Sequence, residues 1–464
     1  MRTTSLKIEE KTMENKVTFY EETNFKNTEI GEIPADWEVV KLGGLIVDEM
    51  NGDWGKGEKE SLDFTKCFVL RGTDFQKAAK GDFEEVPVRF LKDSSLSKRW
   101  LQDGDILVEI SGGGEKQPTG RVLLAKRNWL EKIHCPVVFS NFVKRIRISD
   151  SVCFPEYFYL YWKLLYQNKK TSFYERRTTG IRNFKYKDFV ENESIPLPPL
   201  EEQKAIAYVL STVQEAREKT EKVIEATKEL KKSLMKHLFT YGPVSLEEAS
   251  RISLKETEIG EIPADWEVVK LEQVGEVVTG NTPSKAKKEY WINGTIDFVK
   301  PPDLRNSCIT TASEKISEHA VHVARLVPSG SVLVSCIGNI GRVGYSLKKT
   351  AFNQQINAIV PNDTINSIYL FFVLQTQAEQ IEKLKAVTTI PIVNKSKFMQ
   401  VLIPLPPLPV QKRIAEILQT VDEKIQAEEK KKQALDSLFN SMLHMLMSGK
   451  LRVKFQTSEE GTSD

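Results

Sequence analysis

The pattern of apolar positions predicts two long helices in this chain. Neither proline nor glycine occurs between residues 201 and 239, and apolar side chains recur there every three or four residues, which gathers them on one helix face. The first set is Ile206, Val209, Leu210, Val213, Ala216, Val223, Ile224, Leu230, Leu234 and Leu238. The second set is Ile414, Ile417, Leu418, Val421, Ile425, Leu435, Leu438, Met442 and Leu446.

Breaker residues delimit both predicted helices. Pro198 and Pro199 precede the first helix and Gly242 follows it, while the second ends before Gly449. Each apolar stripe is close to a heptad seam, and a lone helix does not keep such a seam in water. We therefore expect the two helices to pair as an antiparallel coiled coil about a pseudo-twofold axis.

Elsewhere the pattern indicates a mixed α/β chain. Short runs rich in β-branched residues predict strands within 106–110, 137–148, 330–337 and 356–360. Longer apolar segments predict helices at 158–165 and 368–385. Glycine-rich turns separate these elements, at 111–114 and 338–341.

The sequence contains an internal repeat. The stretch TEIGEIPADWEVVKL runs from Thr28 to Leu42 and recurs, letter for letter, from Thr257 to Leu271. A second motif, IPLPPL, occurs at Ile195–Leu200 and at Ile403–Leu408, just before each predicted long helix. Between these motifs the copies differ, although GDILV at 104 matches GSVLV at 330 and FSN at 139 matches FNQ at 352. The repeat indicates two equivalent structural units whose sequences differ between the shared motifs.

The predicted fold is mixed α/β, with two globular α/β domains, each followed by a long helix. The predicted layout is an N-terminal extension at 1–27, a first globular domain at 28–194, a first long helix and linker at 195–256, a second globular domain at 257–402, a second long helix at 403–450 and a mobile tail at 451–464.

Charge and composition refine this picture slightly. The net charge is +2, yet residues 43–194 hold 26 Lys+Arg against 22 Asp+Glu, and residues 272–402 hold 14 against 10. Both unlike segments are therefore mildly basic, which weakly favours a polyanion as partner. No apolar run is long enough to span a bilayer, no secretory signal is visible, and five scattered cysteines without a CxxC pair suit reduced thiols, so we expect a cytoplasmic protein.

Catalytic signatures are absent from the sequence. We find no GxxxxGK[ST] phosphate loop, no GxGxxG after a strand and no HExxH. His319 and His322 come nearest to a metal motif, but without an acidic partner at useful spacing a structural role is favoured. The sequence favours a binding protein without metal or cofactor, and a dispersed active site remains the alternative.

Polar loop residues are the candidates for binding. Arg and Lys suit phosphates, while Asn and Gln suit the edge of adenine. Residue type and loop position nominate Lys56, Arg121, Asn141, Arg176, Arg177, Arg182, Lys185, Asn281, Ser284, Lys287, Lys288, Arg342, Asn353, Gln354, Gln355 and Lys395. The alternative is that the basic clusters are solvated loop faces and the amides are caps or turn formers.

The doubled motifs resemble the specificity subunit of Type I restriction-modification systems. GEIPADWEVVKL is similar to the segment that opens each target recognition domain of that family, and IPLPPLEEQKAIA and IPLPPLPVQKRIA resemble the entry to each conserved helix. Residues 103–121 and 289–361 resemble two different types of recognition domain. The resemblance covers nearly the whole chain, from Thr28 to about Lys450.

The resemblance implies a non-catalytic, sequence-specific DNA-binding subunit. Each recognition domain would read one half of a bipartite site in double-stranded DNA, with an unspecified spacer set by the helix pair. Two modification (methyltransferase) subunits and the restriction (motor-nuclease) subunits would be the partners, and S-adenosylmethionine, ATP and Mg would bind to them. Trp37, Trp266, Gln203 and Gln411 would serve in partner contact or domain docking.

Two other classes of function stay open from sequence. One is a stand-alone DNA-modifying enzyme with a dispersed active site. The other is a helical scaffold protein without a DNA role. Neither has a positive motif in this chain.

Overall fold

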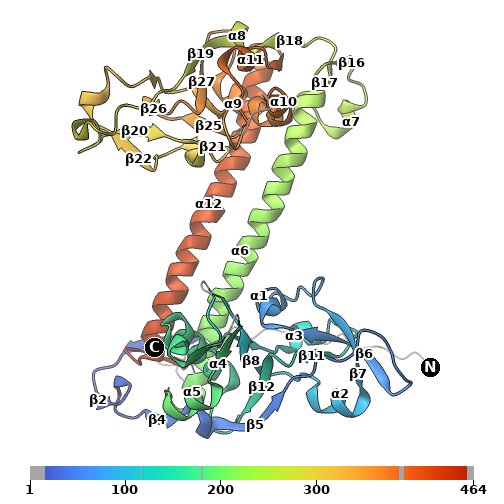
Figure 1. The fold of residues 1–464 in the computed structure, drawn as a ribbon, viewed down its shortest axis with the longest axis vertical. Coiled ribbons are helices and arrows are strands. Elements are labelled where there is room, and N and C mark those ends of the chain that lie inside the picture. The colour runs from blue at the N-terminus through green and yellow to red at the C-terminus, as the bar shows by residue number, and fades with distance from the viewer. Residues whose placement is uncertain (1–15, 115–116, 179–180, 386–390, 457–464) are drawn as a thin grey trace, which may run out of the picture. The chain divides into compact units, whose positions relative to one another are not determined.

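The structure, a computed structural model, describes residues 16–114, 117–178, 181–385 and 391–456. Two compact units make up the fold. Unit 1 comprises Met1–Lys219 with Lys432–Asp464, and unit 2 is Thr220–Lys431. Helices α6 (Leu200–Tyr241) and α12 (Leu408–Met447) each contribute residues to both units (Figure 1). The described residues include no helix that is both long and apolar enough to cross a membrane.

Unit 1 is built on two main sheets. A four-stranded sheet has the order β10-β8-β12-β5, and a three-stranded sheet has the order β11-β6-β7. Their bounds are β5 Ile46–Asn51, β6 Phe64–Leu70, β7 Val88–Lys92, β8 Ile106–Glu109, β10 Val122–Leu124, β11 Val137–Phe139 and β12 Val143–Ile148. The smaller strands are β2 Phe25–Thr28, β3 Gly31–Pro34, β4 Glu38–Lys41, β9 Ser111–Gly112, β13 Glu175–Thr178, β14 Ile181–Phe184 and β15 Ser194–Leu197. The helices before α6 are α1 Phe75–Ala78, α2 Asp93–Arg99, α3 Arg127–Leu130, α4 Pro155–Gln167 and α5 Tyr186–Asn192.

Unit 2 repeats this plan. Its sheets have the orders β19-β27-β24-β25-β21 and β22-β20-β26-β23. Their bounds are β19 Gly275–Thr279, β20 Ile296–Val299, β21 Ser307–Ile309, β22 Glu314–Ile316, β23 Leu326–Val327, β24 Val332–Ser335, β25 Val343–Ser346, β26 Thr350–Phe352 and β27 Ile356–Pro361. The smaller strands are β16 Leu254–Thr257, β17 Gly260–Pro263, β18 Glu267–Lys270 and β28 Leu402–Leu405. The other helices are α7 Leu246–Ala249, α8 Leu271–Val274, α9 Ser367–Thr376, α10 Ala378–Lys383 and α11 Lys395–Met399.

The two units share one strand topology despite their unlike sequences. The order β5, β12, β8, β10 matches β19, β27, β24, β25, and the parallel pair β6–β11 matches β20–β26. The predicted mixed α/β fold with an internal repeat is therefore confirmed. One predicted helix, at 368–385, is divided at Gln377 into α9 and α10, and Gln380 of α10 exchanges two hydrogen bonds with the backbone of Leu402 in β28.

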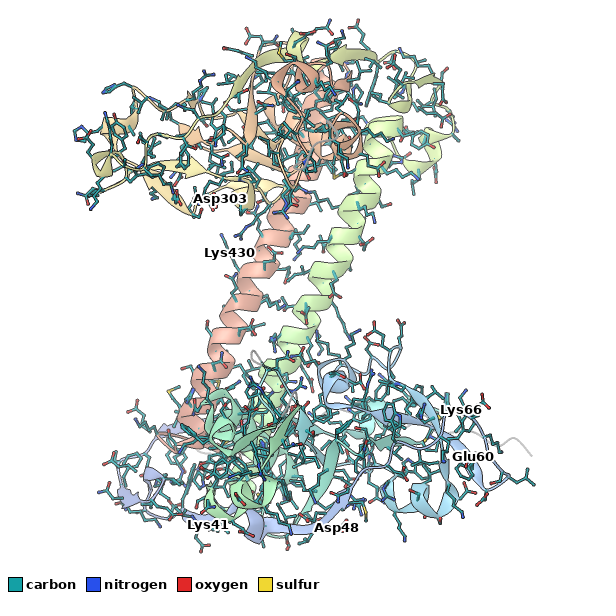
Figure 2. All side chains as sticks on the ribbon, in the orientation of Figure 1. Lys41, Asp48, Glu60, Lys66, Asp303 and Lys430 are labelled. Atoms are coloured by element: carbon teal, nitrogen blue, oxygen red, sulfur yellow. The ribbon has the colours of Figure 1, made fainter. Side chains whose placement is uncertain are left out.

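Helices α6 and α12 run antiparallel within each unit (Figure 1). In unit 1, Arg217 Nε lies 2.5 Å from Asp436 Oδ1. In unit 2, Lys228 pairs with Glu429 and Lys231 with Asp422, both at 2.6 Å. Residues further along α6 therefore pair with residues earlier in α12, as antiparallel helices require. The predicted pairing of the two long helices is confirmed. Polar side chains project from their outer faces, as Lys430 does on α12 (Figure 2).

The two copied motifs form a small sheet at the base of each globular domain. Strand β4 pairs antiparallel with β15, placing Val39 opposite Pro196, and β18 pairs with β28 in the same register. At the strand edge Lys41 Nζ binds Glu29 Oε1 at 2.8 Å and the Asn192 carbonyl at 3.0 Å. Because each motif needs its partner to complete the sheet, they recur together.

A buried glutamine fastens each globular domain to its long helix. Gln203 Oε1 accepts from Phe154 N at 2.8 Å, and its Nε2 donates to the Val152 and Pro198 carbonyls at 3.1 and 2.8 Å. Gln411 does the same with Asn366 N, Thr364 O and Pro406 O, at 2.7, 3.2 and 2.8 Å. All six partners are backbone atoms, so this attachment depends little on the side chains of the domain.

Each copied tryptophan packs on the glycine that ends a long helix. Trp37 is fully buried and Trp266 is 3% exposed. A Cβ on Gly449, after α12, would lie 3.2 Å from Trp37 Cη2, and a Cβ on Gly242, after α6, would lie 3.4 Å from Trp266 Cζ2. Both glycines have positive φ, as helix C-caps commonly do. Trp37 and Trp266 therefore pack against the ends of the long helices, and their part in domain docking or partner contact stays a prediction.

Replacing Gly449 with alanine is expected to destabilise unit 1. Its φ is +68°, and the added Cβ would lie 2.3 Å from Pro34 Cγ. Strain and overlap together should cost about 2 kcal/mol or more, seen as a lower thermal midpoint. The control is Gly31→Ala, which has a φ of +107° but nothing within 4 Å of the added Cβ. Equal losses in the two variants would show that the contact with Pro34 and Trp37 is unimportant.

The ends of the described chain meet in a strand pair. Residues 451–464 were expected to form a mobile tail and 1–27 an extension outside the repeat. Instead β29 (Leu451–Phe455) pairs antiparallel with β1 (Val17–Glu21). Val453 is 1% exposed, because alternate residues of β29 face the core of unit 1. Residues 1–15 and 457–464 lie outside the described residues.

Arg452 of β29 binds three carboxylates. Its side chain is 6% exposed and donates two 2.7 Å hydrogen bonds to Glu202 at the start of α6. It also binds Asp36 at 2.9 and 3.0 Å and Glu22 at 2.5 Å. Its guanidinium carbon lies 5.4 Å from the ring centroid of Trp37, whose Nε1 donates to Glu202. In unit 2 the residue matching Glu202 is Val410, so this cluster belongs to unit 1 alone.

Candidate nucleic-acid interface

Four loop segments of unit 1 meet at one edge of its main sheet. Asp53 N donates to Phe139 O at 2.9 Å, which brings residues 52–53 against the turn at 141–142. Ile110 N donates to Phe142 O at 2.9 Å, and Ser111 Oγ donates to Asn183 Oδ1 at 2.8 Å. Gly112 and Ser111 pair with Arg182 and Asn183 through β9 and β14. We call the residues 52–53, 110–112, 141–142 and 182–183 the four-segment edge of unit 1.

Unit 2 builds the same edge from matching segments. Asn281 N donates to Phe352 O at 3.1 Å, and Cys336 N donates to Gln355 O at 2.8 Å. Ile337 bridges Ile392, and Gly338 N donates to Pro391 O at 3.1 Å. Residues 280–281, 336–338, 354–355 and 391–392 form the four-segment edge of unit 2.

A glycine allows the close approach in both edges. A Cβ on Gly52 would lie 2.0 Å from Ser140 O, and a Cβ on Gly280 would lie 2.2 Å from Asn353 O. Both positions are therefore closed to any side chain, since no flexible group could move aside. The shared backbone contacts hold the edge while the side chains on it remain free to differ.

The chemistry of the two edges differs although their backbones match. Unit 1 presents Ser111, Asn141, Phe142, Arg182 and Asn183. At the matching positions unit 2 has Ile337, Gln354, Gln355, Pro391 and Ile392. Hydroxyl, amide and guanidinium groups suit hydrogen-bonded readout of base edges, and apolar groups suit a thymine methyl. One frame thus offers two different sets of contacts.

Some nominated residues lie on these edges. Asn141 and Gln354 are exposed at matching positions, and the Gln354 side chain accepts from Thr282 at 2.6 Å. Gln355 is half-buried beside it. Arg182 is 16% exposed and binds Glu175 at 3.2 Å, so its guanidinium is partly engaged.

Other nominated residues make hydrogen bonds within the fold. Arg121 is 14% exposed and makes two hydrogen bonds to Glu109, at 2.6 and 2.8 Å. Asn353 is buried and its amide caps Gln355 N at 3.1 Å. Asn281 holds the next loop by binding Val323 O at 2.6 Å and Arg325 N at 2.7 Å. These contacts favour roles in shaping the edges rather than in touching a ligand.

The remaining nominees are exposed and lie off the four-segment edges. These are Lys56, Arg176, Lys185, Ser284, Lys287, Lys288, Arg342 and Lys395. Lys56 pairs with Glu60 at 3.2 Å, Lys185 with Asp188 at 3.7 Å, and Lys287 donates to Tyr290 OH at 3.2 Å. The side chain of Arg177 lies outside the described residues, although its backbone pairs with Arg182 in β13–β14.

Sequence reasoning missed several edge residues. Phe142 is 49% exposed and Ile392 is 36% exposed, and Ser111 and Asn183 bind each other. Their signal was the glycine-rich turns at 111–114 and 338–341, which mark a close approach of backbones. Which segment approaches them could not be read from the chain.

Comparisons with known proteins agree with this architecture. A model of the family described as Type I restriction modification DNA specificity domain matches residues 34–228 and again 263–437. The chain is 28% identical over 465 residues to the type I restriction enzyme MjaVIII specificity subunit of Methanocaldococcus jannaschii, covering 94% of this chain and 98% of that protein. It is 34% identical over 191 residues to the MjaIX specificity subunit of the same organism, covering 40% of this chain and 44% of that protein.

A solved structure shares the fold. The crystal structure of the S subunit of a type I restriction-modification system from M. genitalium aligns with a TM-score of 0.59 at 16% identity, covering 88% of this chain and 96% of that one.

The fold defines a protein with one strand topology repeated in two units, whose matching edges carry unlike side chains. The two matches of the family model fall on the two copies and together span most of the chain. The chain belongs to the Type I restriction modification DNA specificity family, and it is a DNA-specificity subunit.

Proposed function

We propose that this subunit reads a bipartite asymmetric DNA site, one half with each four-segment edge. The observation that carries this proposal is the match of backbone and mismatch of side chains between the two edges. Ser111 is replaced by Ile337, Asn141 by Gln354 and Asn183 by Ile392 at equivalent positions. Two edges with the same backbone but different hydrogen-bonding groups select different bases.

The helix pair is proposed to set the unspecified spacer between the half-sites. Helices α6 and α12 have 42 and 40 residues, which corresponds to about 60 Å at ~1.5 Å per residue. Sites read from one face of a duplex recur every ~34–36 Å, or one helical turn. Helices of this length with ion pairs in both units suit a fixed separation.

Catalysis is proposed to reside in partner subunits. We infer that the chain directs adenine methylation and restriction by two methyltransferase subunits and by motor-nuclease subunits. S-adenosylmethionine, ATP and Mg would bind to those partners, and this chain would contribute no catalytic residue. The polar outer faces of α6 and α12 are the proposed surface for the partners. Methyl transfer or cleavage by the purified chain alone would contradict this assignment.

Substituting the exposed amides tests which edge reads which half. Gln354→Ala is expected to relax one base of the half-site read by unit 2, and Asn141→Ala one base of the other half. A bidentate amide contact to adenine contributes roughly 1–3 kcal/mol of discrimination, or about 5- to 150-fold. The measurement is the methylation rate of duplexes that vary one base at a time, using the assembled methyltransferase.

Gln400→Ala is the matched control, because it removes an exposed amide, just after α11, that donates to Glu272 at 2.9 Å. It should leave both halves unchanged. Relaxation of both halves by either edge variant would contradict the assignment of one half to each unit.

A further inference from the structure

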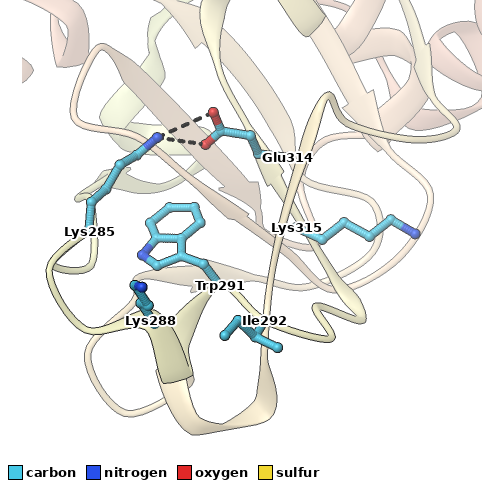
Figure 3. A pocket seen from close by; sticks show the side chains of 6 residues that line it. All are labelled: Lys285, Lys288, Trp291, Ile292, Glu314 and Lys315. Carbon is cyan, nitrogen blue, oxygen red and sulfur yellow. Dashed lines mark hydrogen bonds and ion pairs between the residues drawn. The ribbon is translucent and has the colours of Figure 1, made fainter.

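A basic pocket with an aromatic wall lies on the smaller lobe of unit 2, away from its four-segment edge. Its volume is about 440 Å³, and it is lined by Lys285, Lys288, Trp291, Ile292, Glu314 and Lys315 (Figure 3). The lobe is the sheet β22-β20-β26-β23, with Phe298, Ile316, Ala320 and Ala351 in its core. None of the edge residues lines this pocket.

The pocket carries an excess of positive charge. Glu314 is the only carboxylate among the lining residues, and it binds Lys285 at 3.2 Å (Figure 3). It also binds Lys300 at 2.8 Å. Both lysines lower the pKa of Glu314, so it stays ionised and is neutralised by them. Lys288 and Lys315 add charge that Glu314 does not offset. An anion therefore suits the pocket.

The wall of the pocket is fixed and apolar. Trp291 donates its Nε1–H to Ser284 O at 3.3 Å and packs edge-on against Phe298 at 5.1 Å. Lys285 Nζ lies 5.0 Å from the centroid of its ring. Ile292 beside it is 57% exposed, an unusual place for a large apolar side chain. A ligand with an anionic group and an adjoining less polar part fits this combination.

Unit 1 holds a related pair on its matching lobe. Arg89 lies over the ring of Trp54 at 4.9 Å, and Trp54 follows the edge segment 52–53. Arg89 is on β7, which pairs with β6 as β22 pairs with β20 in unit 2. Each lobe thus sets a cation over an indole, although the cation comes from β7 in unit 1 and from the loop after the edge in unit 2.

The pocket also lies within reach of whatever the edge binds. Lys285 follows Asn281 by four residues, so their Cα atoms are at most about 14 Å apart. The major groove is ~12 Å wide, which is the scale separating a base edge from the phosphates beside it. A duplex read by the edge of unit 2 would therefore present backbone phosphates to this lobe.

We propose that the pocket binds the phosphates of the DNA backbone through Lys285, Lys288 and Lys315, with a deoxyribose against Trp291 and Ile292. This inference rests on the proposed function, and it assigns the pocket a sequence-independent role. It would anchor the duplex beside the half-site that the edge of unit 2 reads, since phosphate contacts fix register without selecting bases.

The test uses the variant Lys288→Gln/Lys315→Gln in the assembled complex with its methyltransferase subunits. Binding to two fluorescent duplexes, one with the mapped target and one of random sequence, is measured against salt. Each lysine lost from a phosphate should reduce the slope of log K against log salt by about 1. Affinity at ~0.1 M salt should fall roughly tenfold on both duplexes alike.

Two further variants sharpen the test. Ile292→Glu places an anion at the pocket rim on an exposed position and should weaken both duplexes at least as much. Arg251→Gln/Lys383→Gln removes two exposed charges, one just after α7 and one on α10, and Leu246→Glu adds one on α7, where Leu246 is 82% exposed. These controls should leave binding and slope unchanged.

The outcomes separate this inference from the function it rests on. A loss confined to the target duplex, or no loss beyond the controls, would overturn the phosphate pocket. If Gln354→Ala still relaxed the target in that case, bipartite reading would stand. Absence of salt-dependent DNA binding by the unmodified complex would overturn both.

Discussion

A chimaera in which residues 43–194 come from a related specificity subunit is expected to direct methylation to a half-changed motif. The half read by unit 2 should stay the same, while the other half is replaced entirely by that of the donor. The structural reason is that attachment uses the copied segments. Trp37 and β4 lie outside the exchanged residues, and Gln203 binds only backbone atoms of the domain.

The measurement is the sequence motif of methylated adenines in cells that carry the chimaera. The reciprocal exchange of residues 272–402 is the matched control and should change the opposite half, since Gln411 also binds only backbone atoms. A motif altered in both halves by either exchange would show that the two domains do not read independently.

Replacing Arg452 with methionine is expected to destabilise unit 1 by about 3–5 kcal/mol, the usual loss when one partner of a buried ion pair is removed. Glu202 is 8% exposed and Glu22 14% exposed, so both carboxylates would lose their buried cation. Methionine keeps most of the volume, which separates the loss of charge from the loss of packing. Thermal or denaturant unfolding of the purified complex measures it.

Two controls identify the cause of that loss. Lys450→Met removes an exposed charge just before β29 and should have little effect. Adding Glu202→Gln to Arg452→Met should recover part of the stability, because it removes a buried unpaired charge. Full stability in the single variant would mean that β29 is held by its backbone pairing and by Val453 alone.

The cluster also has a predictable dependence on pH. The hydrogen bond from Arg452 holds the pKa of Asp36 below its ordinary value, and burial acts against it. A depressed carboxyl pKa contributes stability above the unfolded value of about 3.9, and that contribution is lost as pH falls through the folded pKa. The difference between the native chain and Arg452→Met should therefore shrink below about pH 4.

The long helices could be predicted because the spacing of apolar residues is a local signal, and the repeat because its two copies share identical sequence. Apolar spacing predicted the bounds of α6 and α12 to within a few residues. The identical sequence of the two copies identified the motifs that form β4, β15, β18 and β28. Strands such as β8 and β24 followed from short β-branched runs between turns.

The candidate site was harder to predict because it depends on contacts between distant segments. Arg121 has the residue type of a phosphate contact, but its guanidinium donates two hydrogen bonds to Glu109 on the neighbouring strand. Ser111 gains its place through pairing with Asn183, and Phe142 through its carbonyl, which accepts hydrogen bonds from Ile110 N and Ser111 N. Strand β29 was missed because its partner β1 lies at the other end of the chain.

The most direct test of bipartite reading is a genome-wide map of methylated adenines in cells that co-express this chain with its methyltransferase subunit. Bipartite reading predicts one asymmetric motif, with two specified halves separated by a gap of constant length, that disappears when this chain is deleted. A short continuous motif, or methylation that persists without the chain, would contradict it.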